Sequence, residues 1–557
     1  MSATTANPVA STGDSDALSH KQIMTILSGL MLGMFLAALD QTIVSTAIRT
    51  IGDDLHGLSI QAWVTTAFLI TSTIATPLFG KLSDIYGRKP FFMLAISIFI
   101  LGSALCGLSQ SMYMLAAFRA FQGIGAGGIM PLALAIIGDI IPPRERARYQ
   151  GYFMAIFATS SVLGPVVGGF LSGQSKIFGV HGWRWIFYIN VPIGIIALFV
   201  VMRVLKLDHN RHAQRIDWWG AAMLIVGLVP LLIVAEQGRD WGWGSAAAFA
   251  CYLVGLLGLL GFVWVQKRMG DAALLPLRLF RGSVFSLGAA QSFIVGIGMF
   301  GGLAAIPLYL QVVKGASPTK AGLLILPLVL GIMAASLTAG QITSRTGRYK
   351  IFPVAGSVLL VLGMFLLTSV GADTALWVTD VYMLIFGAGL GMNMQTIVLA
   401  MQNAVEPRDM GVATSATTFF RQVGGSLGTA VFLSILFSSA TSKISSAYSK
   451  AKGTPAFQHA AAAHPDQLKS IQGGGSLNDT SFLNGLVDAL KHPFLVGFSD
   501  AMDLVFLVGG FVLVIAFVLS VFMKEVPLRT VSGNAARRAA EDAADVAPAP
   551  GAGTLGH

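Results

Sequence analysis

The sequence has few charged residues and almost no cysteine. Only 11% of its 557 residues are Asp, Glu, Lys or Arg, whereas a typical soluble chain has about 25%. Together with a hydrophobic fraction of 54%, this shortage of charge excludes an ordinary soluble protein and predicts an all-α integral membrane protein. Cys106 and Cys251 both lie inside apolar segments, so neither can bridge exposed loops, and cysteine usage leaves the redox compartment undetermined.

Sequence motifs for enzyme chemistry are also missing. The chain contains no P-loop G-x-x-x-x-G-K-[ST], no H-E-x-x-H and no Cys/His cluster, so ATP-driven pumping and metal hydrolysis have no residues to carry them. We expect no enzyme activity, no metal site and no cofactor, with energy taken from an ion gradient. The formal charge of +10 does not indicate a nucleic-acid partner, because the basic residues sit in short loops beside apolar runs, where they orient helices.

Long apolar runs dominate what remains. Since a helix needs about 20 residues to cross the hydrocarbon core, these runs predict fourteen spans, and an even number puts both termini on one side. The predicted spans are Ile23 to Ile48, Trp63 to Phe79, Phe91 to Leu108, Met112 to Ile137, Tyr152 to Leu171, Ile186 to Val204, Trp219 to Ala235, Ala246 to Val265, Val284 to Leu310, Ala321 to Ile342, Phe352 to Val370, Val381 to Met401, Val412 to Phe437 and Phe494 to Phe522.

Lys and Arg concentrate in alternate loops between these spans. Basic residues flank membrane helices on the cytoplasmic side, so the orientation follows, with both termini cytoplasmic. The basic loops contain Arg88/Lys89, Arg144/Arg146/Arg148, Lys206/Arg211/Arg215, Lys267/Arg268/Arg278/Arg281 and Arg345/Arg348/Lys350, and the intervening acidic loops contain Asp53/Asp54, Glu236/Asp240 and Asp373.

One charge-dense loop occurs twice. Residues 80–90 read GKLSDIYGRKP, and residues 340–350 read GQITSRTGRYK with the same spacing of Gly and Gly-Arg and a Lys close behind, although Ser344 stands where the first copy has Asp84. A repeat of this kind predicts two related halves. Eight spans separate the copies, whereas two adjoining six-helix halves would separate them by six, so two helices are inserted.

This count predicts the domain organisation. We expect a cytoplasmic tail at 1–20, an N-terminal six-helix bundle at 21–205, two inserted helices with their loops at 206–282, a C-terminal six-helix bundle at 283–526 and a disordered cytoplasmic tail at 527–557. Residues 438–493 are too polar to cross the membrane. We therefore expect them to form a large outer loop, which can contact a periplasmic or envelope partner.

The first copy of the repeated loop resembles a motif of the major facilitator superfamily, G-x-L-x-D-x-x-G-R-K. This resemblance implies the major facilitator fold, in which two six-helix bundles with inverted repeats rock around a midplane cavity, here with two inserted helices and fourteen transmembrane helices in all. The loop would act as a hinge between packed helices. The matching residues are Gly80, Leu82, Asp84, Gly87, Arg88 and Lys89.

A carboxylate deep in the first span is the main candidate for chemistry. Asp40 lies in LDQTIV after several apolar turns, and burial disfavours the charged form of a carboxylate, so the group can load and release a proton as water access alternates. Arg119 in the fourth span needs a partner, and Asp40 is the one we expect. A purely structural ion pair is the alternative. The two stretches resemble the L-D-x-T-I-V motif of fourteen-helix drug:proton antiporters and the R-x-x-Q-G-x-G motif tied to proton transfer.

Two further stretches make the resemblance specific. Gly164, Pro165, Gly168 and Gly169 in the fifth span predict a pliable joint with a close helix neighbour, and they resemble the G-P-x-x-G-G motif that marks antiporters in the superfamily. Residues 183–194, WRWIFYINVPIG, resemble a hallmark of the fourteen-helix branch, the EmrB/QacA type. The resemblance covers nearly the whole chain.

The resemblance implies a proton-coupled antiporter, expected to be monomeric, that exports lipophilic and cationic drugs or toxic compounds across the bacterial cytoplasmic (inner) membrane. Export of an endogenous lipid, siderophore or metabolite by the same fold stays open as the alternative. An uptake symporter and a non-transporting scaffold or receptor are further alternatives that the motifs disfavour. Candidates for the substrate cavity are Gln41, Gln122, Asn190, Met299, Asn393, Gln395, Phe420 and Arg421.

Overall fold

The computed structural model describes residues 20–56, 62–205, 215–467, 483 and 485–529. The predicted tails at 1–20 and 527–557 therefore lie almost entirely outside the described residues. The N-terminal half contains α1 (His20–Asp54), α2 (Ala62–Tyr86), α3 (Arg88–Gly107), α4 (Met112–Ile140), α5 (Pro143–Ser172), the antiparallel hairpin β1 (Lys176–Ile177) and β2 (Val180–His181), α6 (Trp185–Tyr188) and α7 (Asn190–Val204).

The rest of the described chain is helical as well. Two helices, α8 (Trp218–Trp241) and α9 (Ala246–Met269), come before the C-terminal half. That half contains α10 (Ser283–Leu308), α11 (Pro318–Leu324), α12 (Leu326–Thr346), α13 (Ile351–Leu367), α14 (Leu376–Ala404), α15 (Met410–Ala451), α16 (Pro455–Ala463) and α18 (Asp488–Phe522).

A helix lies at each of the fourteen predicted spans. Within the described ranges, 12 helices are long and apolar enough to cross a membrane, and two shorter apolar helices, Thr159–Ser172 and Ile351–Leu367, fall at the fifth and eleventh predicted spans. Large apolar side chains stay exposed on their outer faces, with Leu253 and Leu257 of α9 each 59% exposed. Such a surface suits hydrocarbon rather than water.

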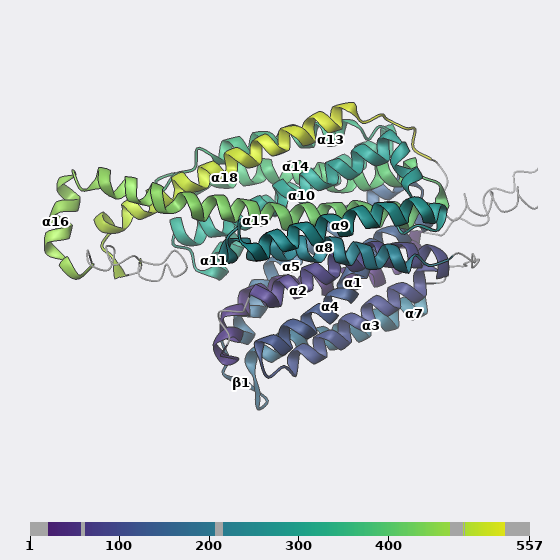
Figure 1. Cartoon of the computed structure of the whole chain (residues 1–557), viewed down its shortest axis with the longest axis horizontal. Coiled ribbons are helices and arrows are strands. Elements are labelled where there is room, and N and C mark those ends of the chain that lie inside the picture. The colour runs from purple at the N-terminus through teal and green to yellow at the C-terminus, as the bar shows by residue number, and fades with distance from the viewer. Residues whose placement is uncertain (1–19, 57–61, 206–214, 468–482, 484, 530–557) are drawn as a thin grey trace, which may run out of the picture.

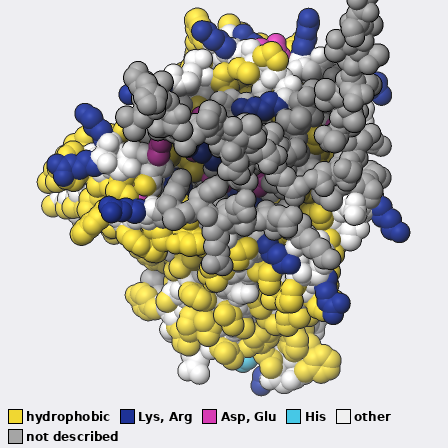
Figure 2. Space-filling view, turned by 90° about the vertical axis from the view of Figure 1, so that its right-hand side faces the viewer, with side chains coloured by type: hydrophobic (Ala, Val, Ile, Leu, Met, Phe, Trp, Pro, Cys, Tyr) yellow, Lys and Arg dark blue, Asp and Glu magenta, His cyan; other side chains and the backbone are white. Residues whose placement is uncertain are grey.

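The helices form two groups, with α8 and α9 alongside them (Figure 1). One apolar core joins α1 to α4 with α5 and α7 and includes Phe92 and Phe99, and another joins the helices of the C-terminal half around Phe386 and Phe432. A third cluster packs Leu224 and Leu228 of α8 against the C-terminal half. Figure 2 looks onto the end of the molecule at which Lys267 lies and shows Lys and Arg side chains around its rim.

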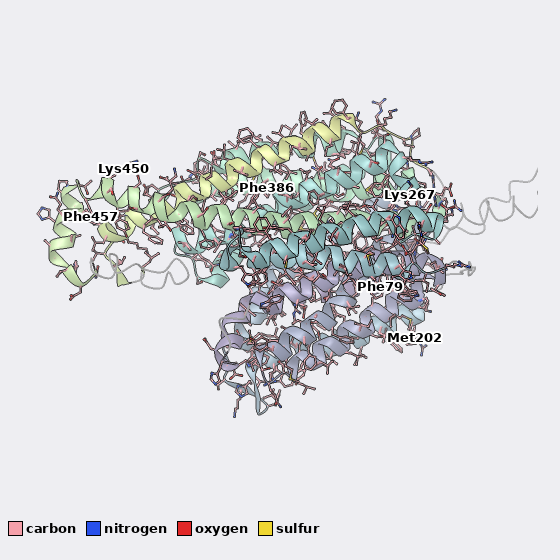
Figure 3. All side chains as sticks on the ribbon, viewed as in Figure 1. Phe79, Met202, Lys267, Phe386, Lys450 and Phe457 are labelled. Atoms are coloured by element: carbon pink, nitrogen blue, oxygen red, sulfur yellow. The ribbon has the colours of Figure 1, made fainter. Side chains whose placement is uncertain are left out.

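The polar segment 438–493 differs from the loop that its composition predicts. Helix α15 continues past the predicted end of its span to Ala451, α16 follows, and α18 already begins at Asp488. The Tyr448 ring packs edge-on against Phe457 at 6.2 Å, and the Tyr448 hydroxyl donates to the Leu490 carbonyl at 3.0 Å. These contacts build the projection on which Figure 3 labels Lys450 and Phe457. Hydropathy marks where a helix leaves the hydrocarbon, not where the helix ends.

Candidate functional site

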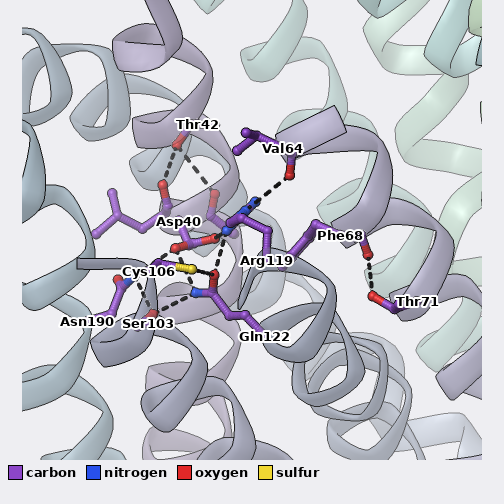
Figure 4. Close-up of polar contacts among 12 residues, drawn as sticks. Asp40, Thr42, Val64, Phe68, Thr71, Ser103, Cys106, Arg119, Gln122 and Asn190 are labelled. Carbon is purple, nitrogen blue, oxygen red and sulfur yellow. Dashed lines mark hydrogen bonds and ion pairs between the residues drawn. The ribbon is translucent and has the colours of Figure 1, made fainter. Parts of the chain in front are cut away.

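Asp40 of α1 lies at the centre of a buried polar network (Figure 4). Its Oδ2 accepts from Arg119 Nη1 at 2.5 Å, and its Oδ1 accepts from Gln122 Nε2 at 3.0 Å and from Asn190 Nδ2 at 2.7 Å. Ser103 Oγ accepts from the same two amides, at 2.6 Å and 3.1 Å. All five side chains are buried, so one carboxylate joins α1, α3, α4 and α7 out of contact with solvent.

Arg119 has partners besides the carboxylate. Its Nη1 also donates to Gln122 Oε1 at 2.7 Å, its Nε reaches the Val64 carbonyl at 3.5 Å, and its guanidinium carbon lies 4.0 Å from the centre of the Phe68 ring. Because arginine stays protonated in proteins, only the carboxylate of this ion pair can change its charge. Neutralising Asp40 would leave Arg119 held by neutral groups alone.

The Gly-Pro segment of α5 packs directly on the helix that carries Asp40. A Cβ at Gly164 would come within 2.0 Å of Thr42 Oγ1, and one at Gly168 would come within 3.0 Å of the Ile43 carbonyl oxygen. Thr42 Oγ1 also donates to the Ser160 carbonyl at 3.0 Å. The two glycines therefore permit a close approach of α1 and α5, and at Gly164 a larger residue would force the helices to shift. Because the two helices are in direct contact, a displacement of α1 at Asp40 would also displace α5.

The first copy of the repeated loop ties the two halves together. Asp84 accepts from the backbone N–H groups of Gly411 at 3.2 Å and Val412 at 3.0 Å, at the N-terminus of α15. Arg88 holds that carboxylate at 2.5 Å and also pairs with Asp139 at 2.8 Å. A buried carboxylate at a helix N-terminus is favourable because it accepts from free N–H groups and faces the positive end of the helix dipole.

Two more contacts join the halves at the same end of the molecule. A Cβ at Gly80 would lie 2.2 Å from Ser415 Oγ of α15, so only glycine fits between the helices. The buried Arg146 guanidinium donates to Gln402 of α14, and also to the carbonyl oxygens of Gly138 at 2.9 Å and Ile141 at 3.0 Å. This end, where the predicted cytoplasmic loops lie, is closed.

The C-terminal half has a buried polar cluster of its own, and it is uncharged. Gln291 Nε2 donates to Asn393 Oδ1 at 3.0 Å and lies 3.5 Å from Ser357 Oγ, while Asn393 Nδ2 donates to the Gly389 carbonyl at 3.0 Å. These side chains come from α10, α13 and α14, whereas Asp40, Ser103 and Arg119 come from α1, α3 and α4. The two clusters thus use the first, third and fourth predicted spans of each half.

The predicted cavity residues do not gather in one place. Gln122 and Asn190 belong to the Asp40 network, Asn393 belongs to the uncharged cluster, and Met299 is buried in the C-terminal core. Gln41 is exposed on α1. The remaining three predicted cavity residues, Gln395, Phe420 and Arg421, lie on α14 and α15.

Phe420 lines an apolar cavity of about 600 Å³ between α8, α9, α10 and α15. Phe293 and Phe419 line it too, whereas Met299, another predicted cavity residue, is not among its lining residues. The inserted helices contribute Leu228, Leu259 and others. Its size falls within the roughly 300–1,000 Å³ of small-molecule pockets.

Several residues of these sites gave no signal in the sequence. Ser103 is one of many small polar residues in apolar helices, and only its position beside Asn190 and Gln122 makes it part of the network. Arg146 was expected only as one of several loop cations that orient the helices, although its contact with Gln402 joins the halves. A pattern of local spacing cannot report contacts between helices far apart in the chain.

A comparison with protein families agrees with this architecture. The family profile described as Major Facilitator Superfamily matches residues 30–429.

Several relatives of this chain are transporters by name. An uncharacterized MFS-type transporter of Mycobacterium tuberculosis is 36% identical over 535 residues, which cover 96% of this chain and 74% of the relative. Multidrug resistance protein 3 of Bacillus subtilis is 34% identical over 93% of this chain and 98% of the relative, and the multidrug transporter protein MdtP of the same organism is 36% identical over 72% and 73%.

Solved structures share the fold at low identity. The proton:xylose symporter XylE superposes with a TM-score of 0.58 at 15% identity, over 93% of this chain and 100% of that chain. The human organic anion transporter MFSD10 gives a TM-score of 0.55 at 16% identity, over 88% and 99%. At such identities the likeness concerns the fold alone.

Proposed function

Because this chain belongs to the major facilitator superfamily and is a multi-pass membrane transporter rather than an enzyme, we propose that it is a drug:proton antiporter of the fourteen-helix type. It would export lipophilic compounds across the cytoplasmic membrane of a bacterium. The names of the Bacillus relatives support drug efflux, and the G-P-x-x-G-G segment supports exchange rather than symport. The division into two bundles and two inserted helices, the monomeric state, the cytoplasmic termini and an envelope partner at 438–493 stay predictions.

The buried Asp40 network is the observation that carries the proton coupling. It contains a single carboxylate, Asp40, and a single permanent cation, Arg119, with neutral Gln122, Asn190 and Ser103 around them. Proton uptake by Asp40 would break its ion pair and weaken the hydrogen bonds that join four helices, since charge-assisted bonds are roughly twice as strong as neutral ones. Proton loss would restore them. The network can therefore exist in two states that differ by one proton.

The packing of α5 supplies a route from this network to the other half. Thr42 and Ile43 follow Asp40 on α1 and rest on Gly164 and Gly168 of α5. Pro165, which lies between these two glycines on α5, faces Gly322 of α11, whose Cβ position lies 3.2 Å from the proline ring. A shift of α1 on protonation would move α5 against the C-terminal half. Opening toward the cytoplasm would then require the Asp84 contact with α15 to separate, as alternating access demands.

The cargo is expected to be lipophilic. The cavity lined by Phe293 and Phe420 offers an apolar surface to a compound that enters from the membrane, and aromatic side chains adapt to many shapes of ligand. The cationic charge of the cargo is predicted from the resemblance alone. An endogenous lipid, siderophore or metabolite would be exported by the same steps.

The test uses inverted vesicles with an acidified interior and lipophilic compounds added outside. We expect these compounds to dissipate the pH gradient with the wild type and to leave it intact with Asp40→Asn, which keeps the size of the side chain but cannot ionise. Asn393→Leu, in the uncharged cluster, is the matched control and should retain coupling. Transport that survives Asp40→Asn would reject Asp40 as the coupling group.

The absence of transport by the wild type would also be informative. If correctly inserted wild-type protein dissipates no gradient with a broad panel of drugs, drug efflux is rejected and lipids and metabolites of the host are tested next with the same vesicles.

A further inference from the structure

Arg421 on α15 is an arginine within the membrane that has no partner. It is half-buried, and among the described residues no carboxylate, hydrogen-bond acceptor or aromatic ring pairs with it. By contrast, Arg88 and Arg119 are each held by a carboxylate at 2.5 Å. An uncompensated charge in a membrane span is costly and marks a functional site unless a partner neutralises it.

Gln395 on α14 is a second unsatisfied group. It is 6% exposed, yet its Oε1 has no hydrogen-bond partner among the described residues. A buried amide of this kind costs free energy unless something fills its hydrogen bonds. Gln395 thus leaves an unfilled acceptor on α14, the helix beside the one that carries Arg421.

The helix periodicity places both groups on the inner faces of their helices. Gln402 of α14 donates to Thr414 Oγ1 of α15 at 2.7 Å, where the two halves meet. Gln395 precedes Gln402 by seven residues, and Arg421 follows Thr414 by seven, so each lies two turns further along on the same face. Because α14 and α15 run antiparallel, Gln395 and Arg421 are both displaced from the Gln402–Thr414 contact in the same direction, away from the closed end.

The neighbouring residues confirm the direction of this face. Gln422 Oε1 accepts from Thr76 of α2 at 3.3 Å, so α15 borders the N-terminal half at this level. On the opposite side, Phe419 and Phe420 turn to the cavity with the inserted helices. Arg421 thus belongs to the interface between the halves rather than to the lipid surface.

We propose that Arg421 binds the acidic group of a lipophilic anion, so that amphipathic carboxylates are cargo of this transporter. The proposal rests on the proposed efflux function and names its substrate class. In the ion pair with Asp40 the charge of Arg119 is neutralised, which leaves Arg421 as the uncompensated cation on this face. A cationic cargo would be repelled there, whereas a carboxylate would accept hydrogen bonds from the guanidinium.

The test compares two probes that differ only in charge, 11-(dansylamino)undecanoic acid and its methyl ester. Their binding to purified protein in nanodiscs is followed by dansyl fluorescence. We expect the wild type to bind the acid at least about tenfold more tightly than the ester, the scale of a charge-assisted hydrogen bond. Arg421→Gln should reduce this ratio to near one without weakening ester binding, and Arg421→Lys should retain part of it.

Two controls keep the test decisive. Arg348→Gln, at an exposed arginine on the loop after α12, should leave the ratio unchanged. Arg421→Gln should be at least as resistant to heat as the wild type, because it removes an unpaired charge; a size-exclusion profile shows that it is folded. A folded Arg421→Gln protein that still prefers the acid, or a wild type without preference, would overturn the proposal.

The same probes separate this proposal from the efflux function. If wild-type vesicles move the ester in an Asp40-dependent way but show no preference for the acid, only the acidic-group site is wrong. If they move neither probe, efflux itself is wrong, and the equilibrium binding ratio still decides whether Arg421 binds acids.

Discussion

The loop between α2 and α3 and the loop between α12 and α13 share their spacing of Gly and Gly-Arg but contact different partners. In the first, Asp84 reaches across to the backbone of Gly411 and Val412 in the other half. In the second, the N–H of Tyr349 donates to Glu525 at 2.9 Å and its hydroxyl accepts from the Val526 N–H at 3.0 Å, within the C-terminal half. The first copy contacts the other half, whereas the second copy contacts residues 525 and 526 of its own half.

The two halves also differ in their buried polar clusters. The cluster on α1, α3, α4 and α7 contains a carboxylate and an arginine, whereas the cluster on α10, α13 and α14 is built from Gln291, Ser357 and Asn393. The cluster in the N-terminal half therefore contains a charged pair, whereas the cluster in the C-terminal half contains only neutral donors and acceptors. The duplicated architecture thus places a charged pair in one half and neutral amides in the other.

Breaking the charged cluster should have the largest effect on stability. Arg119→Gln would leave Asp40 buried without a counter-ion, at a cost of about 3–5 kcal/mol. Asn393→Leu in the uncharged cluster should cost only about 1–3 kcal/mol, the penalty of unsatisfied amides. Thermal unfolding in detergent, followed by tryptophan fluorescence, measures both. The double variant Asp40→Asn with Arg119→Gln should recover most of the loss, and failure to do so would mean that Arg119 is needed for packing rather than for charge.

Exchanging the acidic and hydroxyl residues of the two loops should have the next largest effect. Asp84→Ser gives the first loop the residue of the second and removes charge-assisted bonds of about 1.5–3 kcal/mol from the closed end. We therefore expect the cytoplasmic side to open at least about tenfold more often. Alkylation of Met410→Cys, buried at this contact, in a background without Cys106 and Cys251, reports the opening.

The reciprocal change is the control for that exchange. Ser344→Asp should leave the alkylation rate of Met410→Cys near the wild-type rate, because the second loop contacts its own half. Equal effects of the two substitutions would contradict the division of roles between the loops.

The architecture was largely predictable because it depends on local signals. Apolar runs of membrane length and alternate basic loops place a helix at every predicted span, and the expected pairing of Asp40 with Arg119 is present at 2.5 Å. The partners of Asp84 and Arg146 were not predictable, since they lie on α14 and α15, far along the chain. The helical projection beyond Phe437 was missed because hydropathy responds to the bilayer and not to the hydrogen bonds of the helix.

The glycines of the two loops sharpen the comparison further. Gly87 has φ 104° and ψ 148°, a conformation open almost only to glycine, whereas Gly347 has φ 73° and ψ −1°, close to the left-handed helical region that asparagine tolerates. Gly87→Asn should therefore cost about 1–3 kcal/mol, and Gly347→Asn a few tenths. Thermal unfolding of the two variants measures both losses of stability. A larger loss with Gly347→Asn than with Gly87→Asn would contradict the prediction.

A hydrogen bond of the second loop should also contribute little. Tyr349→Phe removes the hydroxyl that accepts from Val526 but keeps the buried ring, and the Tyr349 N–H still donates to Glu525. Burial raises the pKa of this hydroxyl, so it stays protonated at neutral pH and the lost contact is a single neutral hydrogen bond, worth about 1 kcal/mol. Stability should fall by that amount, while the alkylation rate at Met410→Cys and the pH-driven transport stay at wild-type levels, because this loop fastens one half and does not hold the two together.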